Sequence, residues 1–133
     1  MKTKSIHQEI EFDAAPMLVY ECLVNPKKHS AFTQAVATNT DSLTKPFEVY
    51  DGYAHGKNNI LQAGAAIEQT WRAWEDAWPE THFSTIKMTF KSNGKKGTLL
   101  LFDQLDIPEA CAKSIDQGWH EHYWYKLQAY LAR

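Results

Sequence analysis

The length, composition and charge of the chain describe a globular protein and exclude several other classes. It has 133 residues, of which 44% are hydrophobic and 13% aromatic. That is long enough to bury a substantial core and too apolar for a disordered chain. The formal net charge of −2 argues against nucleic acid as a partner, because phosphate binding relies on a clustered positive surface. We therefore expect a single domain over residues 1–133.

The N-terminus and the apolar runs predict neither export nor membrane insertion. Residues 1–5 lead straight into alternating polar and apolar positions, without the apolar region of a signal peptide. The longest aliphatic run, at 99–101, is far too short to span a bilayer. Cys22 and Cys111 lack metal-type spacing, so we expect reduced thiols in a cytoplasmic protein.

The first 34 residues predict one strand followed by two short helices. Residues 5–12 alternate apolar and polar side chains, as a half-buried strand does. Pro16 favours the start of a short amphipathic helix over 15–24. The Asn25-Pro26 pair is typical of an N-cap followed by proline at the first helical position. A second short helix should therefore run to about Gln34.

Residues 36–105 predict a succession of antiparallel strands. Runs of β-branched and aromatic residues alternate with glycine and proline turns. We expect strands near 36–40, 46–51, 53–61, 65–75, 82–92 and 97–105. The Asn-Gly pair in SNGKKG (92–97) is a strong hairpin signal, because it readily adopts positive φ. Consecutive hairpins give an antiparallel meander.

Residues 109–131, after Pro108, predict one long amphipathic helix. At about 100° per residue, apolar side chains form a stripe along one side. The stripe contains Ile115, Trp119, Tyr123, Leu127 and Tyr130, and it is widened by Trp124 and Leu131. A sheet that curls around this helix would bury both apolar faces.

Three motifs resemble the activator-of-heat-shock-protein-90-ATPase (Aha-type) branch of the START/Bet v-like, helix-grip (SRPBCC) superfamily. They are FEVYDGYAHGKNNIL at 47–61, QTWRAWEDAWPETHFSTIKMTF at 69–90 and GWHEHYWYKLQAYL at 118–131. The resemblance covers nearly the whole chain. It implies an α+β helix-grip fold with a curved antiparallel sheet of six or seven strands and two short helices. The long C-terminal helix packs on the concave face of the sheet.

The resemblance also implies a difference in domain content. The eukaryotic co-chaperones of this branch carry a separate N-terminal domain, whereas this chain starts at the first strand of the resemblance. We therefore expect a stand-alone form of their C-terminal domain, with weak or no stimulation of the heat-shock protein 90 ATPase on its own.

The tryptophans of the second motif predict architecture more than a binding site. Trp71 and Trp74 are separated by an odd number of positions on one strand, so their side chains point to opposite faces. Trp78 precedes Pro79 and should plug the loop after this strand. The alternative is that one of these indoles lines a ligand cavity.

The titratable residues predict neither a metal site nor a recognised catalytic site. His120 and His122 lie roughly 200° apart around a helix and cannot share an ion. The chain has no Gly-x-Ser-x-Gly elbow and no phosphate loop. An acid–base pair of Glu68 with Asp103 remains open, supported only by the presence of the two carboxylates. We therefore expect a protein without metal or cofactor, and a binding protein in preference to an enzyme.

A basic group on one hairpin permits two interpretations. It contains Lys87, Lys91, Lys95 and Lys96. These lysines form either a solvated strand face that keeps the sheet soluble or a docking patch for an acidic partner.

A cavity between sheet and terminal helix is the expected ligand site. Its expected lining is Ile86, Met88 and Phe90 from one strand and Ile115, Trp119 and Tyr123 from the helix. Tyr20, Tyr50 and Tyr53 would supply hydroxyl groups. Gly118, inside the helix, indicates a close approach of another backbone or of a ligand, because glycine there costs about 1 kcal/mol.

Two functions follow, and the sequence leaves both open. One is the binding of a small apolar ligand in this cavity. The other is interaction with a chaperone, as in activators of the heat-shock protein 90 ATPase. The competing structural interpretation is that bulky side chains fill the cavity completely.

Overall fold

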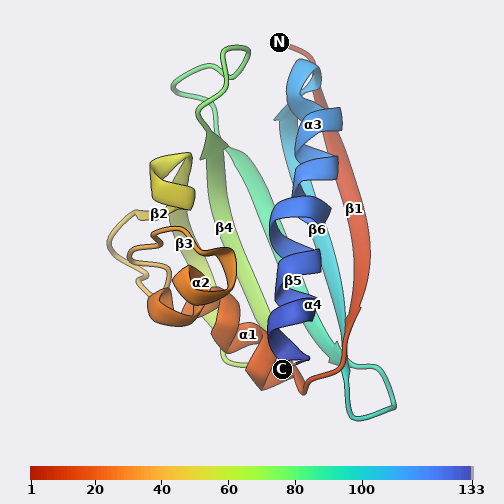
Figure 1. The fold of residues 1–133 in the computed structure, drawn as a ribbon. Coiled ribbons are helices and arrows are strands. Elements are labelled where there is room, and N and C mark those ends of the chain that lie inside the picture. Colours follow the sequence, from red (N-terminus) through yellow and green to blue (C-terminus); the bar gives the residue numbers. More distant parts are fainter. Residues whose placement is uncertain (133) are drawn as a thin grey trace.

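A curved antiparallel sheet wraps around a long C-terminal helix in the computed structural model, which describes residues 1–132 (Figure 1). Within these residues the strands are β1 (Thr3–Phe12), β2 (Phe47–Val49), β3 (Ala54–Gln62), β4 (Ala66–Ala73), β5 (Ser84–Ser92) and β6 (Thr98–Pro108). Their order across the sheet is β1-β6-β5-β4-β3-β2. The last five strands therefore form a meander of hairpins, and β1 adds to its far edge beside β6.

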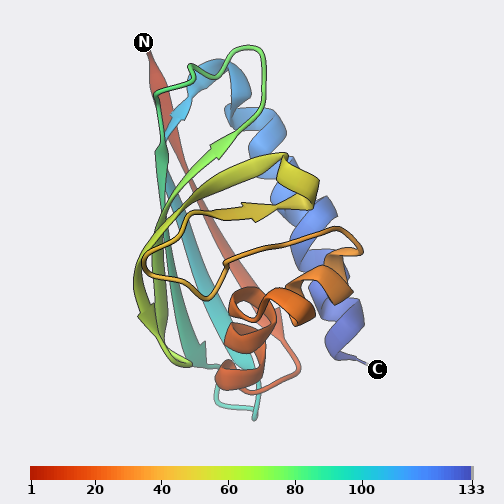
Figure 2. The same cartoon turned by 90° about the vertical axis from the view of Figure 1, so that its left-hand side faces the viewer.

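The helices lie on one side of the sheet, which leaves the opposite face uncovered (Figure 2). They are α1 (Pro16–Val24), α2 (Pro26–Thr33), α3 (Glu109–Trp119) and α4 (Tyr125–Leu131), with a π-helical turn, η2 (His120–Trp124), joining the last two. The Asn25 side chain accepts a hydrogen bond of 3.0 Å from the Lys28 amide, as an N-cap does. The predicted α+β helix-grip fold is confirmed. No helix within residues 1–132 is both long enough and apolar enough to cross a membrane.

Strand alternation sorts the side chains of the sheet as the sequence predicts. On β5, Ile86, Met88 and Phe90 are buried under the helices, whereas Lys87 and Lys91 are exposed on the outer face. This alternation follows from the two-residue period of a strand. The sheet therefore has an apolar concave face and a charged convex one.

The three tryptophans near the β4–β5 loop lie as the sequence predicts, with Trp71 and Trp74 on opposite sides and Trp78 in the loop. Trp71 is 4% exposed on the concave face, and Trp74 is 57% exposed beyond the end of the same strand. Trp78 is buried in the loop, 5.7 Å from the Trp71 ring, and its indole N–H donates to the His82 carbonyl at 2.8 Å. These indoles do not form one stacked site.

The predicted strand at 36–40 is wrong, and the predicted strand at 46–51 is shorter than expected. Only a single bridge joins Thr38 to Glu48, because Asn39, at φ 57°, turns the chain away from the sheet. Strand β2 stops at Val49, because Tyr50 and Asp51 also adopt positive φ. They begin a short 3-10 turn, η1 (Tyr50–Gly52).

The terminal helix differs from the predicted uniform helix at its centre. A π turn closes each hydrogen bond over five residues, so it rotates everything beyond it relative to an unbroken α-helix. Tyr123 and Trp124, adjacent in sequence, are both buried as a result. Leu127 remains fully buried in the next turn. The predicted apolar stripe is confirmed, and the π turn widens it.

Candidate functional site

A groove of about 460 Å³ opens between the terminal helix and the end of the sheet formed by β2, η1, β3 and β4. Its aromatic lining consists of Tyr50, Tyr53, Trp71, Trp119 and Tyr123. The rest of the lining is Val49, Ala54, Glu75, Ser114, Ile115, Gln117, Gly118, Glu121 and His122. Strands supply one wall and the segment around Gly118 supplies the other. The groove lies where β2 ends after three residues and the chain turns away at η1.

The structure divides the predicted cavity residues into two groups. Ile115, Trp119 and Tyr123 line the groove, whereas Ile86 and Phe90 are packed in the core away from it. Met88 borders only a small internal cavity of about 30 Å³, which it shares with Trp119 and Tyr123.

The reason for this division is that α1 covers the middle of the sheet. The Tyr20 ring of α1 lies edge-on to Phe90, with 5.7 Å between centroids, and fills the space over β5. The opening is therefore displaced toward β4 and β3. Of the three tyrosines expected to supply hydroxyl groups, Tyr50 and Tyr53 line the groove and Tyr20 does not.

Two glutamines of the sheet hold the two tryptophans of the terminal helix. The Trp119 indole donates 2.8 Å to Gln104, and the Trp124 indole donates 2.6 Å to Gln8. Gln104 in turn donates to the Ser84 hydroxyl at 3.0 Å, so this buried chain is satisfied at each step. Trp119 therefore forms a fixed wall of the groove. The sequence signal that could have revealed these anchors is a glutamine at an inward position of each strand.

A buried histidine fixes the hydroxyl group at the base of the groove. Nδ1 of His29 donates to the Leu23 carbonyl at 2.9 Å, so Nε2 accepts from the Tyr123 hydroxyl at 2.9 Å. Burial lowers the pKa of His29 to about 4, which keeps the ring neutral at physiological pH. Burial also raises the pKa of Tyr123 well above its ordinary value.

The tyrosines at the mouth of the groove have their hydroxyl protons engaged. The Tyr50 hydroxyl donates to the His122 carbonyl, and the Tyr53 hydroxyl donates to the Glu75 carboxylate at 2.5 Å. Burial raises the pKa of Tyr50 to about 12. Burial, with the hydrogen bond to Glu75 as a second cause, raises the pKa of Tyr53. Both phenols stay protonated, and what they offer a ligand is oxygen lone pairs and ring faces.

Gly118 gives the helix wall of the groove its shape. A Cβ atom at this position would meet only the His122 ring, at 3.7 Å, which is ordinary contact. The close backbone approach expected from the sequence is therefore absent at this glycine. Its missing side chain instead leaves room inside the groove.

The convex face carries a row of alternating charges outside the groove. Glu68, Lys87, Asp103 and His7 are successive cross-strand partners on β4, β5, β6 and β1. Lys87 thus separates Glu68 from Asp103, and the two carboxylates do not form the acid–base pair that the sequence left open. Lys91 lies on this face too, and Lys95 and Lys96 are exposed in the β5–β6 loop.

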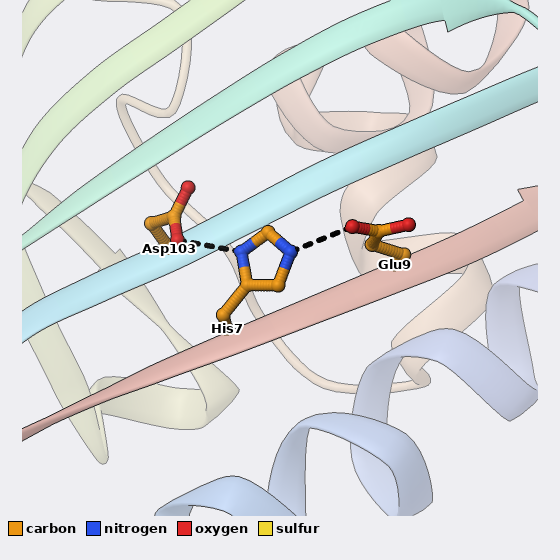
Figure 3. A network of polar contacts seen from close by, with 3 residues as sticks. All are labelled: His7, Glu9 and Asp103. Atoms are coloured by element: carbon orange, nitrogen blue, oxygen red, sulfur yellow. Dashed lines mark hydrogen bonds and ion pairs between the residues drawn. The ribbon is translucent and has the colours of Figure 1, made fainter.

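His7 lies between two carboxylates on this face (Figure 3). Its Nε2 is 2.8 Å from Glu9 and its Nδ1 is 2.7 Å from Asp103. These hydrogen bonds, the one to Glu9 first, raise the pKa of His7. The two contacts use opposite ring nitrogens, so the three side chains do not converge on one point. Within residues 1–132, no group of three or more histidine, cysteine or acidic side chains is arranged to hold a metal ion.

A second surface feature, which we call the Trp74 patch, consists of Trp74, Phe83 and His55 over the buried Arg72. The Arg72 guanidinium donates to the Pro79 and Trp78 carbonyls at 2.9 and 2.8 Å. The Trp74 ring covers it at 4.3 Å and stacks on His55 at 5.4 Å. Among the described residues, the buried side-chain nitrogen and oxygen atoms that lack a hydrogen-bond partner are Nη1 of Arg72 and Nδ1 of His55. Trp74 and Phe83 remain 57% and 38% exposed.

Comparison with known proteins identifies the family. Residues 13–132 match the family described as Activator of Hsp90 ATPase homolog 1-like protein. The chain belongs to this family. The resemblance that the three sequence motifs suggested is therefore confirmed, and the structure is that of an Aha-type domain.

The relatives of this Aha-type domain include longer proteins. It is 34% identical to the activator of 90 kDa heat shock protein ATPase homolog of Dictyostelium discoideum. That alignment spans 117 residues, which is 88% of this chain. It is 32% identical over 114 residues, 85% of the chain, to the human activator homolog 1. The matched segments are only 30% and 32% of those proteins, so the chain spans about a third of their length.

The fold of this domain also occurs in a solved structure of similar length. The crystal structure of an HSP90 activator from Plasmodium falciparum superposes with a TM-score of 0.87 at 16% identity. The superposition covers 96% of each chain. At this identity the likeness shows the fold alone.

Proposed function

We propose that this Aha-type domain binds a small molecule with an apolar, largely flat body in the groove between the terminal helix and β2–β4. The observation that carries the proposal is the groove itself. Its volume of about 460 Å³ is in the range of small-molecule sites, and its walls combine five tyrosine and tryptophan rings with several polar groups. Trp119, held by Gln104, and Tyr123, held by His29, form walls that do not need to rearrange on binding.

The expected affinity follows from the area that such a ligand can bury. About 200 Å² of apolar ligand surface removed from water contributes about 5 kcal/mol before association costs. Contacts with aromatic rings add about 1 kcal/mol each. Since a micromolar dissociation constant needs about 8 kcal/mol, the groove should bind simple aromatic molecules with a Kd of roughly micromolar to millimolar.

The experiment combines native mass spectrometry of the purified protein with NMR titration of small aromatic molecules. We expect shifts at the amides of residues 114–123 and 49–54, and a co-purifying small molecule would identify a ligand directly. Gly118→Leu should block the groove, because the new side chain projects from the helix wall. The matched control is Lys113→Leu, an exposed position on the same helix outside the groove lining. Equal binding by both variants would refute the proposal.

Contact with a chaperone is a second function, and two observations favour it. The curated relatives are named as activators of the 90 kDa heat shock protein ATPase. The Trp74 patch presents an exposed tryptophan and phenylalanine, and aromatic residues are enriched at protein interfaces. We propose that this domain binds such a chaperone, with weak or no stimulation of its ATPase.

A chaperone turnover assay and a calorimetric titration test this second function separately. We expect measurable binding that Trp74→Ala weakens, and little change in turnover. Lys57→Ala, at an exposed position of the adjacent strand β3, is the matched control. Strong stimulation at micromolar protein would contradict the expected lack of activation. Identical binding by the two variants would remove the Trp74 patch from the interface.

A further inference from the structure

The charged side chains of the groove have one sign. Of the described residues that line it, Glu75 and Glu121 carry formal charge at neutral pH, and none is a lysine or an arginine. A neighbouring hollow of about 240 Å³ shares Glu75 with the groove and adds Asp76. The Lys126 ammonium lies 5.8 Å from the centroid of the Tyr50 ring, which belongs to the lining.

The aromatic residues of the groove form one continuous surface. The ring of Trp119 lies 5.5 Å from Trp71 and 4.6 Å from Tyr123, and Tyr123 lies 5.5 Å from Tyr50. The faces of aromatic rings carry partial negative charge and attract cations. The position of Lys126 over Tyr50 shows that this surface already holds one cation at its edge.

The hydrogen-bond donors of the tyrosines and of Trp119 in the groove are already used inside the protein. The hydroxyl groups of Tyr50, Tyr53 and Tyr123 donate to His122, Glu75 and His29 respectively. The Trp119 indole donates to Gln104. What these side chains present to the groove is ring faces and oxygen lone pairs, beside two carboxylates. The tyrosines and Trp119 therefore offer an anion no free donor, and the two carboxylates favour a positive group.

We propose that the groove selects an organic cation, an amine or a quaternary ammonium group attached to an aromatic or aliphatic body. The body lies against Trp71, Trp119 and Tyr123, and the charged group lies toward Glu75 and Glu121. This inference rests on the proposed small-molecule binding and names the chemical class of its ligand. An exposed cation–π contact and an exposed ion pair together correspond to about a tenfold gain in affinity.

Three probes with one naphthalene body test the charge preference by calorimetry. They are 2-naphthylmethyl-trimethylammonium, neutral 2-naphthylmethanol and anionic 2-naphthylacetate. We expect the cation to bind about tenfold more tightly than the alcohol, and the anion to bind most weakly. Added salt should reduce the preference, because the carboxylates are solvent-exposed.

Charge-neutralising variants assign the preference to the groove. Glu75→Gln and Glu121→Gln should each reduce the ratio of cation affinity to alcohol affinity by about threefold. Glu75→Gln keeps an oxygen that can accept from Tyr53, so the fold should persist. The matched control is Asp103→Asn on the convex face, which should leave the ratio as it is.

The outcomes separate this inference from the proposal on which it rests. If the alcohol and the cation bind equally, the charge preference is overturned while small-molecule binding stands. A preference for the cation that neither glutamine variant reduces would also overturn the inference, because the charge would be recognised elsewhere. If none of the three probes binds, both the inference and the proposed function fail.

Discussion

The Tyr123 hydroxyl donates a 2.9 Å hydrogen bond to Nε2 of His29 across 94 positions of sequence. The two rings meet edge-on, with 5.4 Å between centroids. His29 belongs to α2 and Tyr123 to the π turn of the terminal helix. This contact therefore joins the N-terminal helices to the helix that the sheet surrounds.

The buried His29 should make the protein less stable in mild acid. Its pKa is about 4 in the folded state and 6.5 in an unfolded chain. The unfolded chain therefore binds a proton that the folded protein does not, and stability falls as pH drops from 6.5 to 4. The expected loss is about 3 kcal/mol at pH 4. Urea unfolding at several pH values, compared with His29→Gln, measures it, and parallel pH profiles would contradict the assignment.

The contribution of His7 to stability should have the opposite pH dependence. Its pKa is raised, so its contribution to stability is present below pH 6.5 and disappears as pH rises through the folded-state pKa. The hydrogen bond to Glu9 is the larger cause, ahead of that to Asp103. NMR titration of the His7 ring should therefore show a lower pKa in Glu9→Gln and also in Asp103→Asn. An unchanged pKa of the ring in both variants would contradict this assignment.

Two glycines should respond to alanine in opposite ways. A Cβ at Gly118 meets no atom closer than 3.7 Å, so Gly118→Ala should raise the free energy of unfolding by about 0.5–1 kcal/mol through helix propensity. A Cβ at Gly56 would lie 1.8 Å from the Thr70 carbonyl oxygen on the neighbouring strand. Gly56→Ala should therefore destabilise the protein by roughly 3 kcal/mol or more. Chemical denaturation of both variants checks the pair.

Met88→Trp should unfold more easily than the wild type. The cavity beside Met88 is only about 30 Å³, too small for the added volume of an indole. Overpacking of this kind costs about 1–3 kcal/mol. Ligand binding in the groove should persist, because Met88 is not part of its lining. A variant as stable as the wild type would show that the core around β5 rearranges to accept the larger side chain.

Arg72→Lys should loosen the loop between β4 and β5. The guanidinium bonds two loop carbonyls at once, which a single ammonium group cannot reproduce in this geometry. Losing one charged hydrogen bond lowers the free energy of unfolding by roughly 2 kcal/mol. Hydrogen exchange at the Trp78 amide, which bonds to the Glu75 carbonyl, should become faster. Lys91→Arg on the outer face is the control and should leave that exchange rate unchanged.

The sequence predicted those parts of the fold that depend on local periodicity. Strand parity placed Trp71 and Trp74 on opposite faces, and helical spacing put Ile115, Trp119 and Tyr123 on one buried stripe. Both predictions need only the repeat of one element. The strand expected at 36–40 failed because a single residue at positive φ, Asn39, redirects the backbone. Asparagine is one of several residues that tolerate this conformation, so the turn was not evident.

The site was only half predictable, because the groove depends on which elements cover the sheet. Helical periodicity identified Trp119 and Tyr123 as inward-facing, but it gave no information on which strands lie opposite them. Phe90 was expected to line the cavity, yet Tyr20 from α1 fills that space. The opening arises where β2 ends early at η1, a feature of topology. The π turn likewise has no compositional signal.

The buried tryptophans give the protein an intrinsic optical reporter. Trp78, Trp71, Trp119 and Trp124 form a connected series with successive ring separations of 5.7, 5.5 and 5.5 Å, close enough to exchange excitation energy. Trp74, stacked on His55, is the solvent-exposed indole. A soluble quencher should therefore silence Trp74 first and leave the emission of the buried series. Because Trp71 and Trp119 also line the groove, occupancy should change the colour and lifetime of that remaining emission without any added label.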